Sequence, residues 1–165
     1  MALLPSVPST PTTSAITAAP LRTTLGFAGS REKLRDKQIG ELRRLIADPS
    51  VETVHHGGCI GGDEMCHQFA LYVGKTVVVH PPHKSLIRGY CGPAVWSKSK
   101  VVTTNGKDFL LRIDDIIAAC DILIVCPETV KEKRGSRAWY AIRRAKRSGK
   151  TVKIILPPDD DDVGE

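Results

Sequence analysis

Short apolar segments alternate with longer amphipathic ones along this chain, and glycine-rich turns join them. Three of these turns lie where an apolar run gives way to an amphipathic one: Gly29–Arg31, His56–Asp63 and Gly135–Arg137. Each is typical of the passage from a parallel strand into a helix, because glycine permits the sharp turn required there. The alternation predicts an α/β fold in which right-handed crossovers place helices on both faces of a sheet.

The hydrophobic pattern also predicts the individual elements. Strand patterns cover residues 24–28, 51–56, 76–80, 121–126 and 151–156, with one further short strand near 101–102 inside a long loop. Helical periodicity covers about 32–47, 62–74, 105–120 and 136–148. We therefore expect a doubly wound, mainly parallel, Rossmann-like sheet of about five to seven strands.

Helical periodicity further predicts which side chains are buried. In the second helix we expect Met65, Phe69 and Val73 to form the buried stripe. In the third helix we expect Phe109 and Leu110 to lie in the buried stripe together with the isoleucines that follow.

Composition divides the chain into three regions. Residues 1–21 are rich in Pro, Ser, Thr and Ala and predict a disordered leader, residues 22–157 hold the Rossmann-like domain, and residues 158–165 form an acidic tail that we also expect to be disordered. The formal net charge is +6, but the last nine residues contain five of the 18 acidic residues. The remainder has 24 basic residues against 13 acidic ones, which favours an anionic partner.

The five cysteines form no C-x-x-C pair, which is typical of reduced thiols in a cytoplasmic protein. No stretch approaches the roughly 18–20 apolar residues of a membrane span, so we expect no membrane partner.

The glycine turns predict a binding site for a phosphorylated ligand at the carboxyl ends of the strands. Open α/β sheets bind ligands at this edge, where the first N–H groups of each helix attract anions. Ser30 is placed to cap the first helix, and Asp63 to cap the second or to accept hydrogen bonds from ribose hydroxyls. The predicted ligand-binding residues are Gly29, Ser30, Arg31, Gly57, Gly58, Gly61, Gly62, Asp63, Pro127, Glu128, Gly135, Ser136 and Arg137.

The ordered set of turns resembles the SLOG superfamily of Rossmann-like nucleotide-binding domains, related to LOG proteins and DprA. The resemblance rests on Gly29–Arg31, the G-x-D-x-x-x-H pattern of Gly61–His67, His80–Pro82 and Gly135–Trp139. It implies that the chain binds a nucleotide or a nucleotide-derived signal molecule, as sensor, sequestering protein or cryptic enzyme, and that it forms homo-oligomers. LOG enzymes carry a catalytic glutamate in the last turn, where this chain has Trp139.

Alternatives remain open. An N-glycosidase acting on a nucleoside monophosphate would use Asp63, Glu128 or His67 for acid–base chemistry. Single-stranded nucleic acid is a second alternative ligand, bound by the basic helix of residues 136–148, although the regular aromatic residues of a stacking surface are missing there. Trp139 is placed either to stack on a base or to pack against the sheet. Arg88 or Tyr90 would serve as a lid.

The histidines at the strand ends admit a metal site formed by His56, Asp63, His67 and His80. The chain has no H-x-x-x-H or H-E-x-x-H spacing, and hydrogen-bonding roles for these histidines are favoured. We therefore predict no metal and no cofactor.

Overall fold

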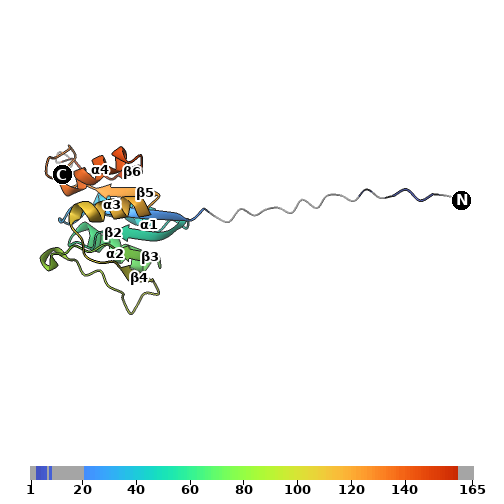
Figure 1. Cartoon of the computed structure of the whole chain (residues 1–165), viewed down its shortest axis with the longest axis horizontal. Helices are drawn as coiled ribbons and strands as arrows, with labels where there is room; N and C mark the ends of the chain where they lie inside the picture. The colour runs from blue at the N-terminus through green and yellow to red at the C-terminus, as the bar shows by residue number, and fades with distance from the viewer. Residues whose placement is uncertain (1–2, 7, 9–20, 160–165) are drawn as a thin grey trace.

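Strands and helices alternate along the computed structural model, which describes residues 3–6, 8 and 21–159 (Figure 1). In chain order the elements are β1 (Thr23–Gly29), α1 (Asp36–Ile46), β2 (Val51–His56), α2 (Gly62–Tyr72), β3 (Thr76–Val79), a 3-10 turn η1 (Ser85–Ile87), β4 (Val101–Thr103), α3 (Phe109–Ala119), β5 (Ile122–Cys126), α4 (Arg137–Arg147) and β6 (Thr151–Ile154). The predicted leader and acidic tail lie largely outside the described residues. No helix in the described part of the chain has the length and apolar character needed to cross a membrane.

All strand pairings are parallel, and the six strands form one sheet in the order β4-β3-β2-β1-β5-β6. This confirms the predicted doubly wound α/β fold. The strand order reverses direction at β1, because β2 lies on one side of it and β5 on the other. Gly29 at the end of β1 is level with Cys126 at the end of β5. Such a switch point opens a crevice at the carboxyl ends of the two strands.

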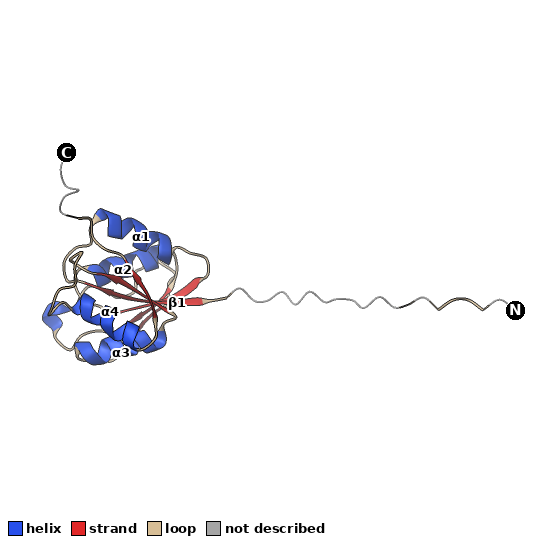
Figure 2. Ribbon diagram, turned by 90° about the horizontal axis from the view of Figure 1, so that it is seen from above, coloured by secondary structure: helices blue, strands red, loops and turns tan. Residues whose placement is uncertain are grey.

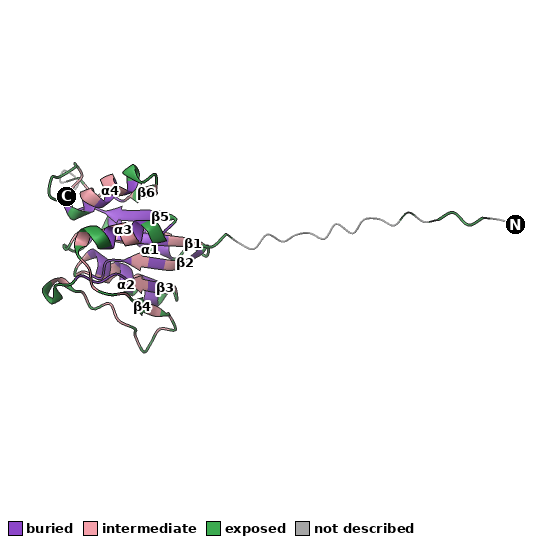
Figure 3. Ribbon diagram, in the orientation of Figure 1, coloured by how far each residue is buried: buried purple, intermediate pink, exposed green. Residues whose placement is uncertain are grey.

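Two helices cover each face of the sheet, α1 and α2 on one and α3 and α4 on the other (Figure 2). The alternation of β1 explains how the two cores divide. Leu25 and Phe27 point into the core under α1 and α2, whereas Ala28 packs in the core under α3 and α4. The central strand β5 is buried along most of its length (Figure 3), as expected for a parallel strand covered on both faces.

Some sequence-based details are wrong. The first helix begins at Asp36 rather than near residue 32, so Ser30 does not cap it; the Ser30 hydroxyl accepts the N–H of Glu32 inside the preceding loop. The buried stripe of α2 is Cys66, His67, Ala70 and Leu71, whereas Met65 and Phe69 are only partly buried against the core and Val73 is 40% exposed. Leu110 is 54% exposed, because α3 docks through Ile113, Ile116 and Ile117.

Candidate ligand-binding pocket

Loops that follow β1, β2 and β5 surround one pocket, with a volume of about 210 Å³, at the switch point of the sheet. The start of α4 and one side of α3 complete the wall. The lining residues are Phe27, Ala28, Gly29, Ser30, Arg31, Gly57, Cys59, Asp63, Phe109, Arg112, Ile113, Ile116, Glu128, Gly135, Ser136, Arg137 and Ala138. The pocket therefore combines an apolar floor with a polar rim.

Nine of the thirteen predicted ligand-binding residues line this pocket, with all three glycine turns represented. They are Gly29, Ser30, Arg31, Gly57, Asp63, Glu128, Gly135, Ser136 and Arg137. Gly58, Gly61, Gly62 and Pro127 do not line it. The fold thus places residues of all three turns around one pocket, although some of their glycines do not line it.

Gly61 and Gly62 allow the second turn to approach the first one closely. Gly61 has a φ of +89°, and a Cβ atom there would lie 2.4 Å from the carbonyl oxygen of Arg31. The N–H of Gly62 donates to the Ser30 carbonyl at 3.1 Å. The second turn can pack directly on the first only because these positions lack side chains. These two glycines therefore hold the first two turns together, although they do not line the pocket themselves.

Arg112 on α3 is a functional candidate that the sequence analysis missed. Its side chain is 4% exposed, and Nη1 donates to the carbonyl oxygens of Gly57 at 2.8 Å and His80 at 3.3 Å. A buried guanidinium thus links α3 to the ends of β2 and β3. The signal was present in the sequence, since Arg112 is a charged residue at a position of the apolar stripe, next to Ile113 and four residues before Ile116.

Asp63 faces Arg112 across the Gly57 backbone. Its Oδ2 accepts the N–H of Cys59 at 3.0 Å, so the carboxyl group closes the second turn instead of capping α2. Burial raises the pKa of Asp63 to about 7, and the Cys59 N–H and the charge of Arg112 oppose that shift only in part. A carboxyl group with this pKa changes its charge near neutral pH.

Arg31 and Arg137 add two further positive charges to the pocket lining. Burial, with the nearby charges of Arg31 and Arg112, lowers the pKa of Arg137. None of these three guanidinium groups forms an ion pair with an acidic residue in the described ranges. Phe109 lies between two of them, with the Arg137 guanidinium 5.1 Å and that of Arg112 6.0 Å from its ring centre. This arrangement favours an anion, which would relieve the mutual repulsion of the arginines.

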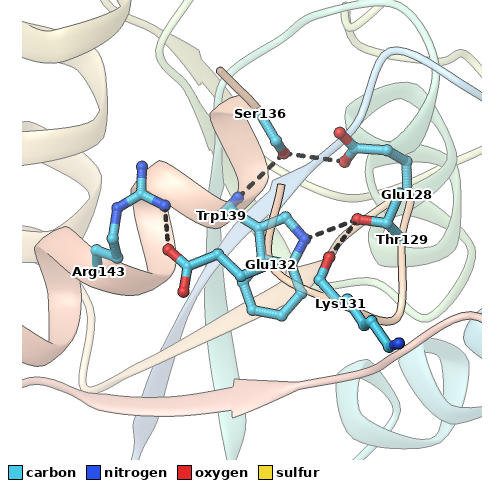
Figure 4. A network of polar contacts seen from close by, with 7 residues as sticks. All are labelled: Glu128, Thr129, Lys131, Glu132, Ser136, Trp139 and Arg143. Carbon is cyan, nitrogen blue, oxygen red and sulfur yellow. Dashed lines mark hydrogen bonds and ion pairs between the residues drawn. The ribbon is translucent and has the colours of Figure 1, made fainter. Parts of the chain in front are cut away.

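Ser136 caps the N-terminus of α4 and forms a hydrogen bond with Glu128 (Figure 4). The Ser136 hydroxyl accepts the N–H of Trp139 at 3.2 Å and donates to Glu128 Oε2 at 3.1 Å. The Trp139 ring, which does not line the pocket, donates its Nε1–H to Thr129 at 3.0 Å. Trp139 therefore supports the loop after β5 and packs in the core under α3 and α4.

His67 lies away from the pocket, in a chain of hydrogen bonds. The Gly58 N–H donates to His56 Nδ1 at 3.0 Å, so His56 carries its proton on Nε2 and donates it to His67 Nδ1 at 3.0 Å. His67 Nε2 then donates to the Gly92 carbonyl at 2.8 Å. Burial lowers the pKa of both imidazoles, most strongly that of His56. Both rings are neutral and use both nitrogens to tie the long loop to the sheet.

The histidine positions also bear on metal binding. His56, His67 and Cys91 have ligand atoms within 4.8 Å of one another. However, the Gly58 N–H occupies the lone pair of His56 Nδ1, and a metal on Nε2 would then require an imidazolate. His80 lies in a separate pair with His55, at 2.9 Å between ring nitrogens. We therefore assign no metal to these groups.

The two residues considered as a lid are held in the long loop. Arg88 Nε donates to the Pro82 carbonyl at 2.8 Å, and the Tyr90 N–H donates to Glu64 at 2.8 Å. Neither residue lines the pocket. On the basic helix α4, Arg143 pairs with Glu132 and Arg144 pairs with Asp114, so part of its charge is already compensated.

Comparison with known proteins finds the fold but no close relative. No family model matches the chain, and no curated protein matches it. Among solved structures, the molybdenum cofactor binding protein from Rippkaea orientalis has 18% identity and a TM-score of 0.58, with 83% of this chain and 78% of that one covered.

Two DprA proteins are also similar. The DNA processing protein A of Streptococcus pneumoniae has 18% identity and a TM-score of 0.60, with 84% of this chain and 52% of that one covered. The protein from Helicobacter pylori, described as binding single-stranded DNA, has 19% identity and a TM-score of 0.57, with 86% and 68% covered. At 18–19% identity these likenesses show a shared Rossmann-like fold.

Proposed function

We propose that this protein binds a nucleotide or a nucleotide-derived signal molecule in the pocket at the end of β1 and β5, with the phosphate between Arg31 and Arg137. The observation that carries the proposal is the meeting of three glycine turns around guanidinium groups that have no acidic partner in the described ranges. The N–H groups of Arg137 and Ala138 open α4, where no intrahelical acceptor exists, and add their dipoles to the site.

Related folds support an anionic ligand of this class. The Helicobacter DprA is described as binding single-stranded DNA, a polymer of nucleotides, and the Rippkaea protein as binding the molybdenum cofactor. A volume of about 210 Å³ is below the roughly 300–1,000 Å³ of pockets that enclose a whole drug-sized ligand. The pocket therefore fits a sugar phosphate, with the base extending outward.

Thermal unfolding with a panel of mononucleotides and dinucleotides tests this proposal. A ligand at 100 times its Kd stabilises the protein by about 2.7 kcal/mol, which gives a clear rise in Tm. Arg31→Ala and Arg137→Ala should abolish that rise, whereas Arg147→Ala on the exposed end of α4 should preserve it. Stabilisation by an oligonucleotide alone, lost in Arg147→Ala, would favour nucleic-acid binding and contradict the proposal.

A second candidate function is hydrolysis of an N-glycosidic bond. The observation that favours it is a carboxyl group, Asp63, whose pKa of about 7 suits a general acid, in the same pocket as Glu128. His67 is left out of this candidate because both of its nitrogens are engaged elsewhere. Release of free base from a nucleoside monophosphate, lost in Glu128→Gln, would support the activity.

Two further expectations concern the cellular compartment and self-association. The five cysteines are all free thiols, which supports a reducing compartment such as the cytoplasm. Self-association follows from the resemblance, and light scattering of the purified protein at several concentrations tests it.

A further inference from the structure

Two buried polar atoms on the pocket wall have no hydrogen-bond partner within the described residues. One is Oδ1 of Asp63 and the other is Nε of Arg112. Both residues line the pocket and are more than nine-tenths buried. Buried polar atoms are normally paired, so each of these two requires an explanation.

The neighbouring groups do not supply the missing partners. Asp63 accepts the Cys59 N–H through its other oxygen. Arg112 uses Nη1 for the carbonyls of Gly57 and His80 and for a long contact of 3.5 Å to the Cys59 sulfur. The two side chains form no ion pair with each other. An acceptor and a donor on two residues that line the same pocket are therefore both without a partner among the described residues.

The chemistry of these two atoms restricts the group that fits them. When Asp63 is ionised, a phosphate oxygen would satisfy Arg112 but would be repelled by the carboxylate, and an ammonium group would satisfy Asp63 but be repelled by Arg112. A hydroxyl group both donates and accepts, and it carries no charge. A hydroxyl group of the ligand can therefore satisfy both atoms.

The positions of the charged residues in the pocket indicate how a sugar phosphate would lie in it. Asp63 reaches the cavity from α2 and Arg137 from α4, which cover opposite faces of the sheet (Figure 2). Arg31, in the loop after β1, and Arg137, at the start of α4, carry two positive charges of the pocket, and Arg112 on α3 carries the third. In a ribose 5-phosphate unit the phosphate and the vicinal hydroxyls lie at opposite ends, so a phosphate beside Arg31 and Arg137 leaves the hydroxyls free to reach Asp63.

We propose that Asp63 and Arg112 bind a ribose hydroxyl of the ligand, so that the pocket selects ribonucleotides over deoxyribonucleotides. This inference rests on the proposed function, because it assumes that the phosphate lies beside Arg31 and Arg137. Asp63 and Arg112 then act as specificity-determining residues.

Isothermal titration calorimetry with matched nucleotides tests the inference. The full-length protein is titrated with AMP, GMP, CMP and UMP, and with their 2′-deoxy and 3′-deoxy counterparts. Removal of the hydroxyl that Asp63 and Arg112 bind leaves a buried donor and acceptor unpaired, so the Kd should rise at least about tenfold for one of the two deoxy series.

The Asp63→Asn variant then connects this selectivity to the residue. Its amide oxygen still accepts the Cys59 N–H, but an NH₂ group replaces the open acceptor. The Kd of the ribonucleotide should rise to that of the deoxy analogue, whose own Kd should change less than about threefold. Asp114→Asn, on α3 and outside the pocket, is the matched control and should keep the wild-type selectivity.

The outcomes separate the inference from the proposed function. Equal affinity of the wild-type protein for all three sugar forms would overturn the inference and leave nucleotide binding standing. Selectivity that persists in Asp63→Asn would overturn the role of Asp63. Absence of binding to every nucleotide would contradict the proposed function and the inference with it.

Discussion

Arg112 combines a permanent charge with almost complete burial. Its guanidinium donates to the backbone carbonyls of Gly57 and His80, which lie at the ends of two neighbouring strands. Gly57 makes this approach possible, because a Cβ atom there would lie 3.0 Å from Nη1. The arginine therefore acts on the architecture of the pocket as well as on its charge.

Replacement of Arg112 by methionine tests the architectural role. The substitution keeps an unbranched apolar stem of similar length but leaves two buried carbonyls without their donor. We expect the free energy of unfolding to fall by about 3 kcal/mol, measured by urea denaturation. Arg134→Met, at an exposed position, should change it by less than about 0.5 kcal/mol. If Arg112→Met also lowered the free energy of unfolding by less than about 0.5 kcal/mol, the two buried carbonyls would not depend on the guanidinium of Arg112.

Asp63 makes stability depend on pH in a defined direction. Burial raises its pKa from 3.8 to about 7, so between these values the folded protein holds a proton that the unfolded chain has released. Stability from this group is therefore lost as pH rises from about 4 to 7. The amide that replaces this carboxyl group in Asp63→Asn carries no such proton, and the free energy of unfolding of the variant relative to wild type should increase from about pH 4 to 8. A constant difference across this range would contradict the raised pKa.

At the scale of elements, the close packing of α3 on β1 depends on Gly26. A Cβ atom at this position would lie 2.8 Å from Cys120 Sγ and 3.0 Å from Ile116 Cγ2. Both contacts belong to the core under α3 and α4. Because α3 also carries Arg112 and Phe109, a shift of this helix would displace one wall of the pocket.

Gly26→Ala should therefore lower the free energy of unfolding by about 1–3 kcal/mol through overpacking. Adding Cys120→Ala removes the nearest clashing atom, and the double variant should recover part of the loss relative to the sum of the single changes. Gly40→Ala is a useful control, since no atom lies within 4 Å of the new methyl group on the helix α1. It should stabilise the protein by about 0.5–1 kcal/mol.

The elements themselves were largely predictable from sequence, because β-branched runs and helical periodicity are local signals. The end of β2 and the short strand β4 lie where the pattern places them. The start of α1 was not predictable in the same way. Its first turn is fixed by Gln38, which accepts the Arg35 N–H and reaches the carbonyls of Pro127 and Ile155, 89 and 117 residues away. Contacts this distant leave no local pattern in the sequence.

At the scale of the whole molecule, four histidines with lowered pKa values affect stability together. Burial is the first cause for His55, His56, His67 and His80, and it lowers the pKa of His80 to about 4. The folded protein holds these rings neutral, whereas the unfolded chain takes up protons below about pH 6.5. Stability from this group is therefore lost as pH falls from about 6.5 to 4.

This acid sensitivity is best measured in the Asp63→Asn variant, because Asp63 acts in the opposite direction over part of the same range. The free energy of unfolding of the variant should fall steadily from about pH 6.5 to 4, and His80→Gln in that background should reduce the slope. A flat profile would show that the histidines are protonated or exposed in the folded protein.

The site was only partly predictable, for a reason that concerns the whole molecule. The glycine turns were recognised because each follows a strand, and parallel strands bring their carboxyl ends to one edge. Arg112 and Phe109 reach the pocket from α3, which covers the face of the sheet opposite α1 and α2. Their position in the pocket follows from packing between segments that are distant in the sequence. His67 is the last residue of the G-x-D-x-x-x-H pattern, but its ring lies in the interior, where it forms a hydrogen bond with His56.

The central claim is that three separate turns bind one anionic ligand at the switch point of the sheet. Titration of the ¹⁵N-labelled protein with its best-bound mononucleotide, followed by amide NMR shifts, tests it most directly. We predict concerted shifts in Gly29–Arg31, Gly57–Asp63 and Gly135–Ala138 that saturate with one common Kd. Saturable binding with shifts confined to the basic outer face of α4, and none in these turns, would contradict it.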